Sequence, residues 1–191
     1  MNQYWETKRL ILRPSAPELA GEVSQYFAKN KEFHRETDPV RPDEFYTEEG
    51  QRTLLCQAAA RQEEGRCLRL WLSLKEEPER IIGFVGLSEI VRGAFLSCFM
   101  GYHMDGELIN RGYCTEAAQK AAEIAFTELG LHRIEANILP CNARSLRVAE
   151  KLGMEREGVS PKYLRINGVW EDHVHMVLRN REMEQQEGED E

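Results

Sequence analysis

One continuous segment, residues 102–153, constrains the fold more than any other part of the chain. It places a turn with Gly112 before a helix, a strand, a proline and a second helix. Polar residues recur at helical spacing from Tyr113 to Leu129, and Gly130 ends this helix because glycine turns left-handed without steric cost. The helix must bury its apolar face against another element. The residues predicted to form that face are Ala117, Ala121, Ile124, Ala125 and Phe126.

The second half of this segment first alternates and then turns helical again. Apolar and polar residues alternate from Arg133 to Leu139, which predicts a strand with one apolar face, and Pro140 ends it. Asn142 can cap the next helix because its side chain accepts a backbone N–H, and Gly153 closes that helix. The segment is therefore predicted to fold as turn, helix, strand and helix.

The chain before this segment predicts further strands and two helices. Two prolines interrupt residues 32–46, which we expect to form an irregular loop. Strict alternation in residues 67–75 predicts a strand with one buried face, made of its leucines. The predicted strands cover residues 6–13, 67–75, 81–91 and 94–104, and the predicted helices cover residues 17–31 and 47–64.

Two long runs follow the segment, at residues 154–166 and 169–179. Asn167 and Gly168 join them, and Asn-Gly is a strong hairpin signal because both residues tolerate positive φ. The complete order of elements predicts an α+β fold. We expect a mixed, mainly antiparallel seven-stranded sheet with helices on both faces.

Composition limits the classes of protein to which the chain can belong. Of 191 residues, 41% are hydrophobic and 30% charged, as in an ordinary single domain, which we place at residues 1–181. Residues 182–191 form an acidic tail that we expect to be disordered. No basic stripe supports nucleic-acid binding, and no apolar run is long enough to cross a membrane. The start of the chain lacks an apolar signal core, which favours a cytoplasmic location.

The cysteines and the net charge carry two further expectations. The five cysteines are odd in number and contain no CxxC pair, so we predict neither a disulfide framework nor a metal site. The net charge of −8 suits a cationic protein substrate, because opposite charges attract at long range.

The turn before the first helix of the segment carries the candidate chemistry. A glycine there lets consecutive backbone N–H groups converge, and the start of the helix adds partial positive charge, a combination that binds phosphate oxygens. Gly112 lies in neither a GxGxxG nor a GxxxxGK[ST] pattern. An ordinary helix-initiating turn therefore remains the alternative to a phosphate site.

The segment as a whole is more specific than its glycine turn. The sequences RGYCTEA and LHRIEANILPCNARSLRVAEKLGM resemble motifs A and B of the GCN5-related N-acetyltransferase superfamily. Together with IVRGAF and YLRINGVWEDH, they are most similar to its ribosomal-protein alanine N-acetyltransferase (RimJ/RimL-like) branch, from ETKRLILRP to HMVL. The resemblance implies a sheet whose fourth and fifth strands part to form a cleft for acetyl-CoA.

The resemblance also implies roles for particular residues. Backbone groups of the fourth strand would pair with the pantetheine arm, and amides of the following loop would hold the pyrophosphate. Asn142 would hold the pantetheine, and Ser145 would lie beside the thioester sulfur and assist the leaving thiolate; these two are the predicted catalytic residues. The predicted cofactor-binding residues are Tyr102, His103, Met104, Asn110, Arg111, Gly112, Tyr113, Cys114, Thr115, Asn137, Asn142 and Ser145.

The chain departs from the family pattern at two catalytic positions. A glutamate that some relatives use as base is replaced by Asn137, and a tyrosine that many use as acid is replaced by Ala149. A free α-amine titrates near pH 8, so a weak base or a chain of waters would suffice. The remaining candidates for a base are Glu36, His103, Asp172, His173 and His175.

These observations predict an acetyl-CoA-dependent N-acetyltransferase with no metal. The expected acceptor is a protein N-terminal α-amine, of the ribosomal-protein type, and the alternative acceptor is a small-molecule amine or a lysine side chain. A non-catalytic acyl-CoA-binding module and a mononucleotide-binding protein are the competing classes. The sequence leaves the oligomeric state open, with a dimer as one alternative.

Overall fold

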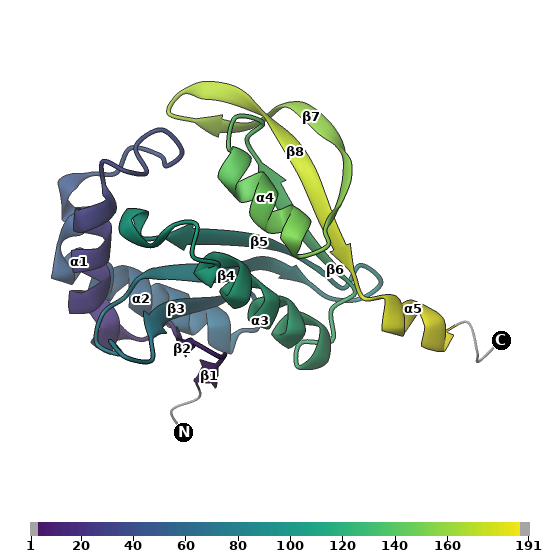
Figure 1. The fold of residues 1–191 in the computed structure, drawn as a ribbon, viewed down its shortest axis with the longest axis horizontal. Helices are drawn as coiled ribbons and strands as arrows, with labels where there is room; N and C mark the ends of the chain where they lie inside the picture. Colours follow the sequence, from purple (N-terminus) through teal and green to yellow (C-terminus); the bar gives the residue numbers. More distant parts are fainter. Residues whose placement is uncertain (1–3, 188–191) are drawn as a thin grey trace.

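The computed structural model describes residues 4–187, which form a single eight-stranded sheet with the strand order β1-β2-β3-β4-β5-β6-β8-β7 (Figure 1). The pairs are antiparallel except for the parallel pair of β5 and β6. The strands are β1 (Trp5–Glu6), β2 (Leu10–Pro14), β3 (Leu68–Leu74), β4 (Gly83–Val91), β5 (Ser97–Met104), β6 (Arg133–Ile138), β7 (Glu155–Ile166) and β8 (Val169–Arg179). The α-helices are α1 (Ala20–Asn30), α2 (Glu48–Glu63), α3 (Tyr113–Thr127), α4 (Ala143–Lys151) and α5 (Arg181–Glu187), with short 3-10 turns η1 (Pro17–Leu19), η2 (Asp43–Tyr46) and η3 (Gly106–Leu108).

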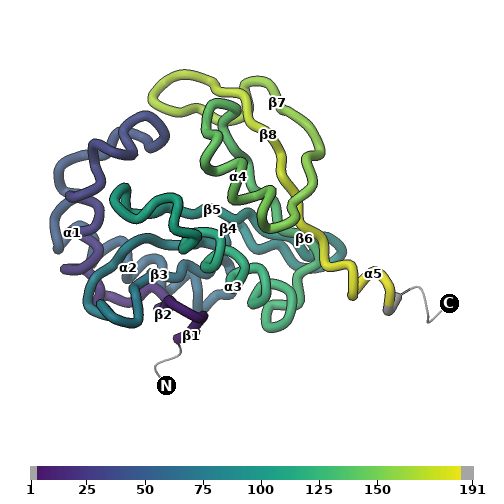
Figure 2. Tube along the Cα trace, viewed as in Figure 1, coloured from purple at the N-terminus to yellow at the C-terminus, as the bar shows by residue number. Residues whose placement is uncertain are grey.

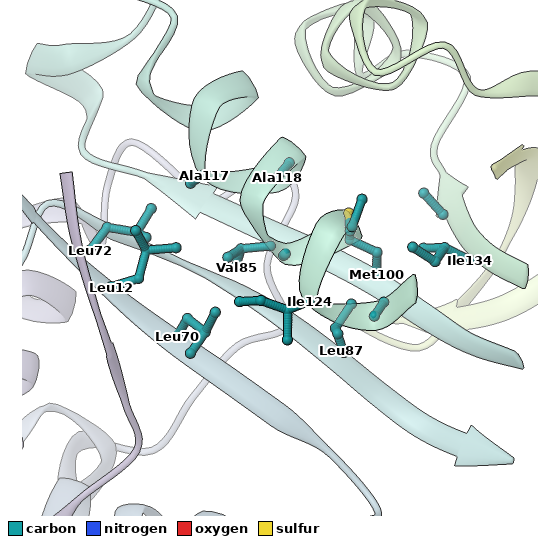
Figure 3. Packing of buried hydrophobic residues seen from close by; sticks show 14 of the residues in the cluster. Leu12, Leu70, Leu72, Val85, Leu87, Met100, Ala117, Ala118, Ile124 and Ile134 are labelled. Atoms are coloured by element: carbon teal, nitrogen blue, oxygen red, sulfur yellow. The ribbon is translucent and has the colours of Figure 1, made fainter. Parts of the chain in front are cut away.

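Helices cover both faces of the sheet, as the sequence predicts. The alanine-rich face of α3 packs on leucine and valine side chains of β2, β3 and β4 (Figure 3). On the opposite face, α1 and α2 bury a smaller cluster that includes Val23, Leu55 and Trp71. Each fully buried large apolar side chain contributes about 1.5–3 kcal/mol, so the two clusters together fix the sheet between its helices.

The strand β3 differs from its prediction, because both of its faces are buried. Its leucines point toward α3, whereas Trp71 and Ser73 are 1% and 0% exposed on the other face. Trp71 packs against Phe27 of α1, with the ring centroids 5.9 Å apart. Alternation of leucine with polar residues cannot reveal that a second helical layer covers the remaining face.

Two ends of the chain also differ from the prediction. The sheet has an eighth strand because β1 pairs with β2, and a strand of two residues is too short to show an alternating pattern. Within the acidic tail, α5 makes the chain helical up to residue 187, where disorder was predicted. His132 and Arg179 both contact the Glu184 carboxylate and hold this helix to the domain. Residues 188–191 lie outside the described part of the chain.

The strands β5 and β6 part from each other, as the resemblance implies. They pair only from Ser97 to Phe99 on β5 and from Arg133 to Glu135 on β6. Beyond these residues β5 continues along β4, whereas β6 follows β8 (Figure 1). The two strands therefore diverge between Met104 and the end of β6, and we call this parting of the strands the opening.

The hairpin of β7 and β8 reaches back to the first half of the chain. Asn167 and Gly168 form its turn with φ of 48° and 88°, which confirms the predicted Asn-Gly hairpin. The Asn167 side chain accepts the Val40 N–H (2.8 Å) and donates to the Asp38 carbonyl (3.2 Å). Figure 2 shows this turn beside the chain that follows α1. The hairpin thus joins the two halves of the sheet across the opening.

Candidate active site

The loop before α3 presents unpaired backbone N–H groups. Asn110 and Gly112 both have positive φ, of 60° and 81°, which turns successive amides toward one side. In the part of the chain that the structure describes, none of the amides from Asn110 to Thr115 donates to another protein group. Gly112 is also the N-cap of α3, so the loop combines bare donors with the positive end of a helix. This geometry is that of an anion site.

The side chain of the residue just before β2 fixes this loop, and the sequence did not predict it. Arg9, just before Leu10, donates from Nη1 to the Arg111 carbonyl (3.0 Å) and from Nε to Glu116 Oε2 (2.7 Å). Its guanidinium also lies over the Tyr113 ring, 4.3 Å from the centroid. Burial would raise the pKa of Glu116, but hydrogen bonds from Thr7 and Arg9 outweigh it and lower that pKa. Arg9 therefore pins both the loop and the first turn of α3.

On the α4 side of β5, Tyr102 and Ser145 contact each other. Tyr102 Oη donates to the Ser145 carbonyl (2.8 Å), and Ser145 Oγ donates to Tyr102 Oη (3.2 Å). Burial raises the pKa of the Tyr102 hydroxyl, so it stays protonated. The Ser145 N–H donates to Asn142 Oδ1 (3.1 Å), which confirms Asn142 as the cap of α4. These three predicted site residues thus lie together beside the opening between the strands.

On the opposite face of β5, His103 lies in a second cluster. Its Nδ1 lies 2.7 Å from Tyr26 Oη on α1, and its Nε2 lies 3.0 Å from Asp38 Oδ2. The His34 ring stacks on it with 3.5 Å between centroids. A pocket of about 240 Å³ opens here between the end of α1, the loop after it and His103. Tyr26, His34 and Asp38 carried no recognisable motif, because they come from a helix and an irregular loop.

His34 is held neutral in this cluster. Its Nε2 donates to the Met104 carbonyl (2.9 Å), so that carbonyl, predicted to pair with pantetheine, already has a partner. Burial, and then the neighbouring His103, lower the pKa of His34 to about 4. Ligand atoms of His34, Asp38 and His103 lie within 4.8 Å of one another, which is the spacing of a metal site. The two rings are nearly parallel, at 28°, so their lone pairs do not converge and coordination would require one ring to turn.

On the other side of the opening lie β6 and the hairpin of β7 and β8. Asn137 Nδ2 donates to Tyr163 Oη (3.3 Å), whereas Asn137 Oδ1 is buried and has no partner among the described residues. An unpaired buried carbonyl is costly, and an N–H of a ligand would satisfy it. Asn137 therefore lies where a ligand donor is needed, although it cannot serve as a base.

The candidate bases divide clearly by position. His175 is engaged on both nitrogens, by Glu135 (2.9 Å) and Ser160 (2.7 Å). His173 is 3% exposed, and Asp172 accepts the Lys162 N–H (2.8 Å) within the hairpin. Of the five candidates, His103 lines the pocket, whereas the other four, including the exposed Glu36, do not. The structure thus favours the His103 cluster over the histidines of β8.

Two strands that part beside a loop of free amides form the arrangement that the resemblance to coenzyme A-dependent acetyltransferases implies. The chain belongs to the acetyltransferase (GNAT) domain family, whose family model matches residues 9–155. It is accordingly an acyltransferase with acetyl-CoA as donor. No described helix is long and apolar enough to cross a membrane.

Relatives of known name agree with this membership. The chain is 37% identical to "Probable N-acetyltransferase YjcK" of Bacillus subtilis, over 93% of the chain and 98% of the relative. It is 33% identical to the "[Ribosomal protein uS5]-alanine N-acetyltransferase" of Escherichia coli, over 90% and 88% respectively. The crystal structure of the ribosomal-protein-S5-alanine acetyltransferase of Vibrio fischeri superposes with a TM-score of 0.88 at 31% identity, covering 93% of this chain and 97% of that one.

Proposed function

We propose that this acetyltransferase modifies the N-terminal α-amino group of a protein, of the ribosomal-protein type. Two similar proteins, from Escherichia coli and Vibrio fischeri, are named as alanine acetyltransferases of a ribosomal protein. The observation that carries the proposal is that β5 presents Tyr102, with Ser145, on the face with α3 and α4, and His103, which lines a pocket, on the opposite face. The donor uses the face with α3 and α4, and the acceptor uses the pocket on the face with α1.

The donor side has a separate part for each portion of the coenzyme. The amides from Asn110 to Thr115 hold the pyrophosphate, and the Arg111 side chain adds a charged contact. The edges of β5 and β6, with Asn137, receive the pantetheine arm. This arm brings the thioester to Ser145, whose hydroxyl, backed by that of Tyr102, can donate to the leaving sulfur. Asn142 positions Ser145 by capping α4.

The acceptor side suits the end of a flexible chain. Asn167 joins the walls of the opening through Asp38 and Val40, which reduces the room for a folded surface. A chain end can enter a pocket of about 240 Å³, whereas a side chain on a rigid domain must bring its neighbours with it. The neutral amine then attacks the thioester carbonyl directly, because both substrates are held at one strand. The C–S bond breaks, coenzyme A leaves as the thiol, and the proton lost by the nitrogen passes to a weak base or to water.

The test is acetyl transfer to a defined set of acceptors. The purified protein is incubated with labelled acetyl-CoA and a ribosomal fraction, and the modified sites are mapped by mass spectrometry. We expect acetyl groups on N-terminal α-amines. Labelling of lysine side chains alone, or release of free coenzyme A with small amines alone, would refute the proposed acceptor.

A further inference from the structure

We propose that the Asp38 carboxylate, held by His103, binds the α-amino group of the acceptor. This inference rests on the proposed function and assigns the group that recognises its substrate. Asp38 belongs to the irregular loop after α1, on the opposite face of β5 from the loop proposed to hold the coenzyme.

In the described part of the chain, the Asp38 carboxylate lacks a lysine or arginine partner. Its partner is the imidazole of His103, at 3.0 and 3.1 Å. The three cationic residues that line the pocket have other partners. Arg35 pairs with Glu32 (3.1 Å), Lys31 pairs with Asp43 (3.7 Å), and Arg41 lies over the Phe45 ring. A carboxylate half-exposed to a pocket in this state attracts an ammonium group.

The carboxylate is also held in place from two directions. Its backbone carbonyl accepts a hydrogen bond from Asn167 at the hairpin turn, and both carboxylate oxygens face His103 Nε2. His103 is fixed in turn by Tyr26, 3% exposed, and by stacking between His34 and Phe84. A group fixed in this way loses little freedom when it binds a ligand. His103 is therefore a positioning residue for Asp38.

The position of this pair matches the geometry of transfer. His103 follows Tyr102 on β5, and successive side chains of a strand point to opposite faces. Tyr102 contacts Ser145 on the donor side, so an amine held at Asp38 approaches the same stretch of β5 from the other face. Both the neutral amine and the ammonium form of the acceptor carry an N–H that can donate to the carboxylate. The attraction is strongest for the ammonium form, in which the acceptor arrives.

The test measures recognition of the amino group without turnover. The protein is saturated with coenzyme A, and calorimetry measures the binding of a short alanine-initiated peptide and of the same peptide with its α-amino group replaced by hydrogen. We expect the wild type to prefer the amino peptide by roughly 10- to 100-fold, the range for a hydrogen bond to a charged group. Asp38→Asn should remove most of this preference. Glu36→Gln, a neutralised carboxylate two residues away on the same loop, should retain it.

Each outcome decides the inference. Equal binding of both peptides by the wild-type protein would overturn the inference, and this comparison does not depend on whether any variant folds. An unchanged preference in Asp38→Asn, with its melting temperature and coenzyme A affinity intact, would overturn it as well. If the wild type binds the amino peptide through Asp38 but transfers no acetyl group to it, the proposed function fails while this assignment stands.

His103 needs a readout that a merely structural role would not move. His103→Gln keeps a side-chain N–H that can donate to Asp38, whereas His103→Ala does not. We expect His103→Ala to raise the KM for the peptide and His103→Gln to keep it near the wild-type value. The KM for acetyl-CoA should be unchanged in both variants. Equal peptide KM values for the two variants would show that His103 does not act through Asp38.

Discussion

Replacing Arg9 should weaken acetyl-CoA binding, although this residue precedes β2 and lies outside the loop proposed to hold the coenzyme. Arg9→Met keeps the aliphatic stem but removes the contacts to Glu116, the Arg111 carbonyl and the Tyr113 ring. The Arg9 side chain is 40% exposed and that of Glu116 18%, so their ion pair is screened and contributes about 0.5–1 kcal/mol. The bond to the carbonyl adds about 1 kcal/mol and the cation–π contact about 0.5–1 kcal/mol.

The sum is about 2–3 kcal/mol, and its distribution between folding and binding is what the experiment measures. If two-thirds of it serves to order the loop, the Kd for acetyl-CoA rises roughly 10- to 30-fold. Calorimetry gives this Kd, and thermal unfolding without ligand gives the loss of stability. Arg61→Met is the matched control, because Arg61 pairs with Glu89 (3.1 Å) away from the loop.

The reasoning would be refuted by one clear result. Suppose that Arg9→Met binds acetyl-CoA as tightly as Arg61→Met does while its unfolding temperature falls. In that case the contacts of Arg9 stabilise the fold and do not order the coenzyme site. A Kd that rises without loss of stability would instead assign the contacts entirely to the loop.

Three further substitutions test other parts of the site. Gly112→Ala places a side chain at a φ of 81°, which costs about 1–2 kcal/mol and should weaken acetyl-CoA binding roughly tenfold in the same calorimetric assay. Burial and His103 lower the pKa of His34 from 6.5 to about 4. Between these pH values the unfolded chain binds a proton that the folded protein does not, so stability falls as the pH falls. His34→Gln should reduce the difference in unfolding free energy, measured in urea, between pH 7.5 and pH 5. Asn167→Gly keeps the positive φ but removes the bonds to Asp38 and Val40, and should raise the KM for a peptide acceptor several-fold without changing that for acetyl-CoA.

Local patterns in the sequence predict most of the fold. The helix after Gly112, the Asn142 cap and the hairpin at Asn167 and Gly168 each depend on neighbouring residues, so spacing and turn chemistry suffice to find them. The parting of β5 and β6 has no local signal; it followed from the resemblance to a family. The two-residue β1 and the second buried face of β3 depend on packing that alternation does not encode.

The candidate site was predicted less completely, and the reason is distance along the chain. Arg9 meets Glu116 across 107 residues, and Asp38 meets His103 across 65. Neither residue belongs to a motif, and an exposed arginine or a loop aspartate looks like ordinary surface in a sequence. The loop before α3 could be predicted as the coenzyme site because glycine is required where it turns, whereas its contacts with Arg9 and the position of Asp38 in the pocket emerge only from tertiary structure.

The alternation of side chains along β5 separates two specificities that share one strand. Tyr102 and His103 are adjacent, yet Tyr102 contacts Ser145 on the proposed donor face and His103 contacts Tyr26 on the proposed acceptor face. If the proposed sites are correct, we expect substitutions at position 103 and in the loop around Asp38 to change which amines the enzyme accepts while its use of acetyl-CoA is preserved. Inserting or deleting a single residue in this strand would reverse both faces at once, so its length is far less free to change than its composition.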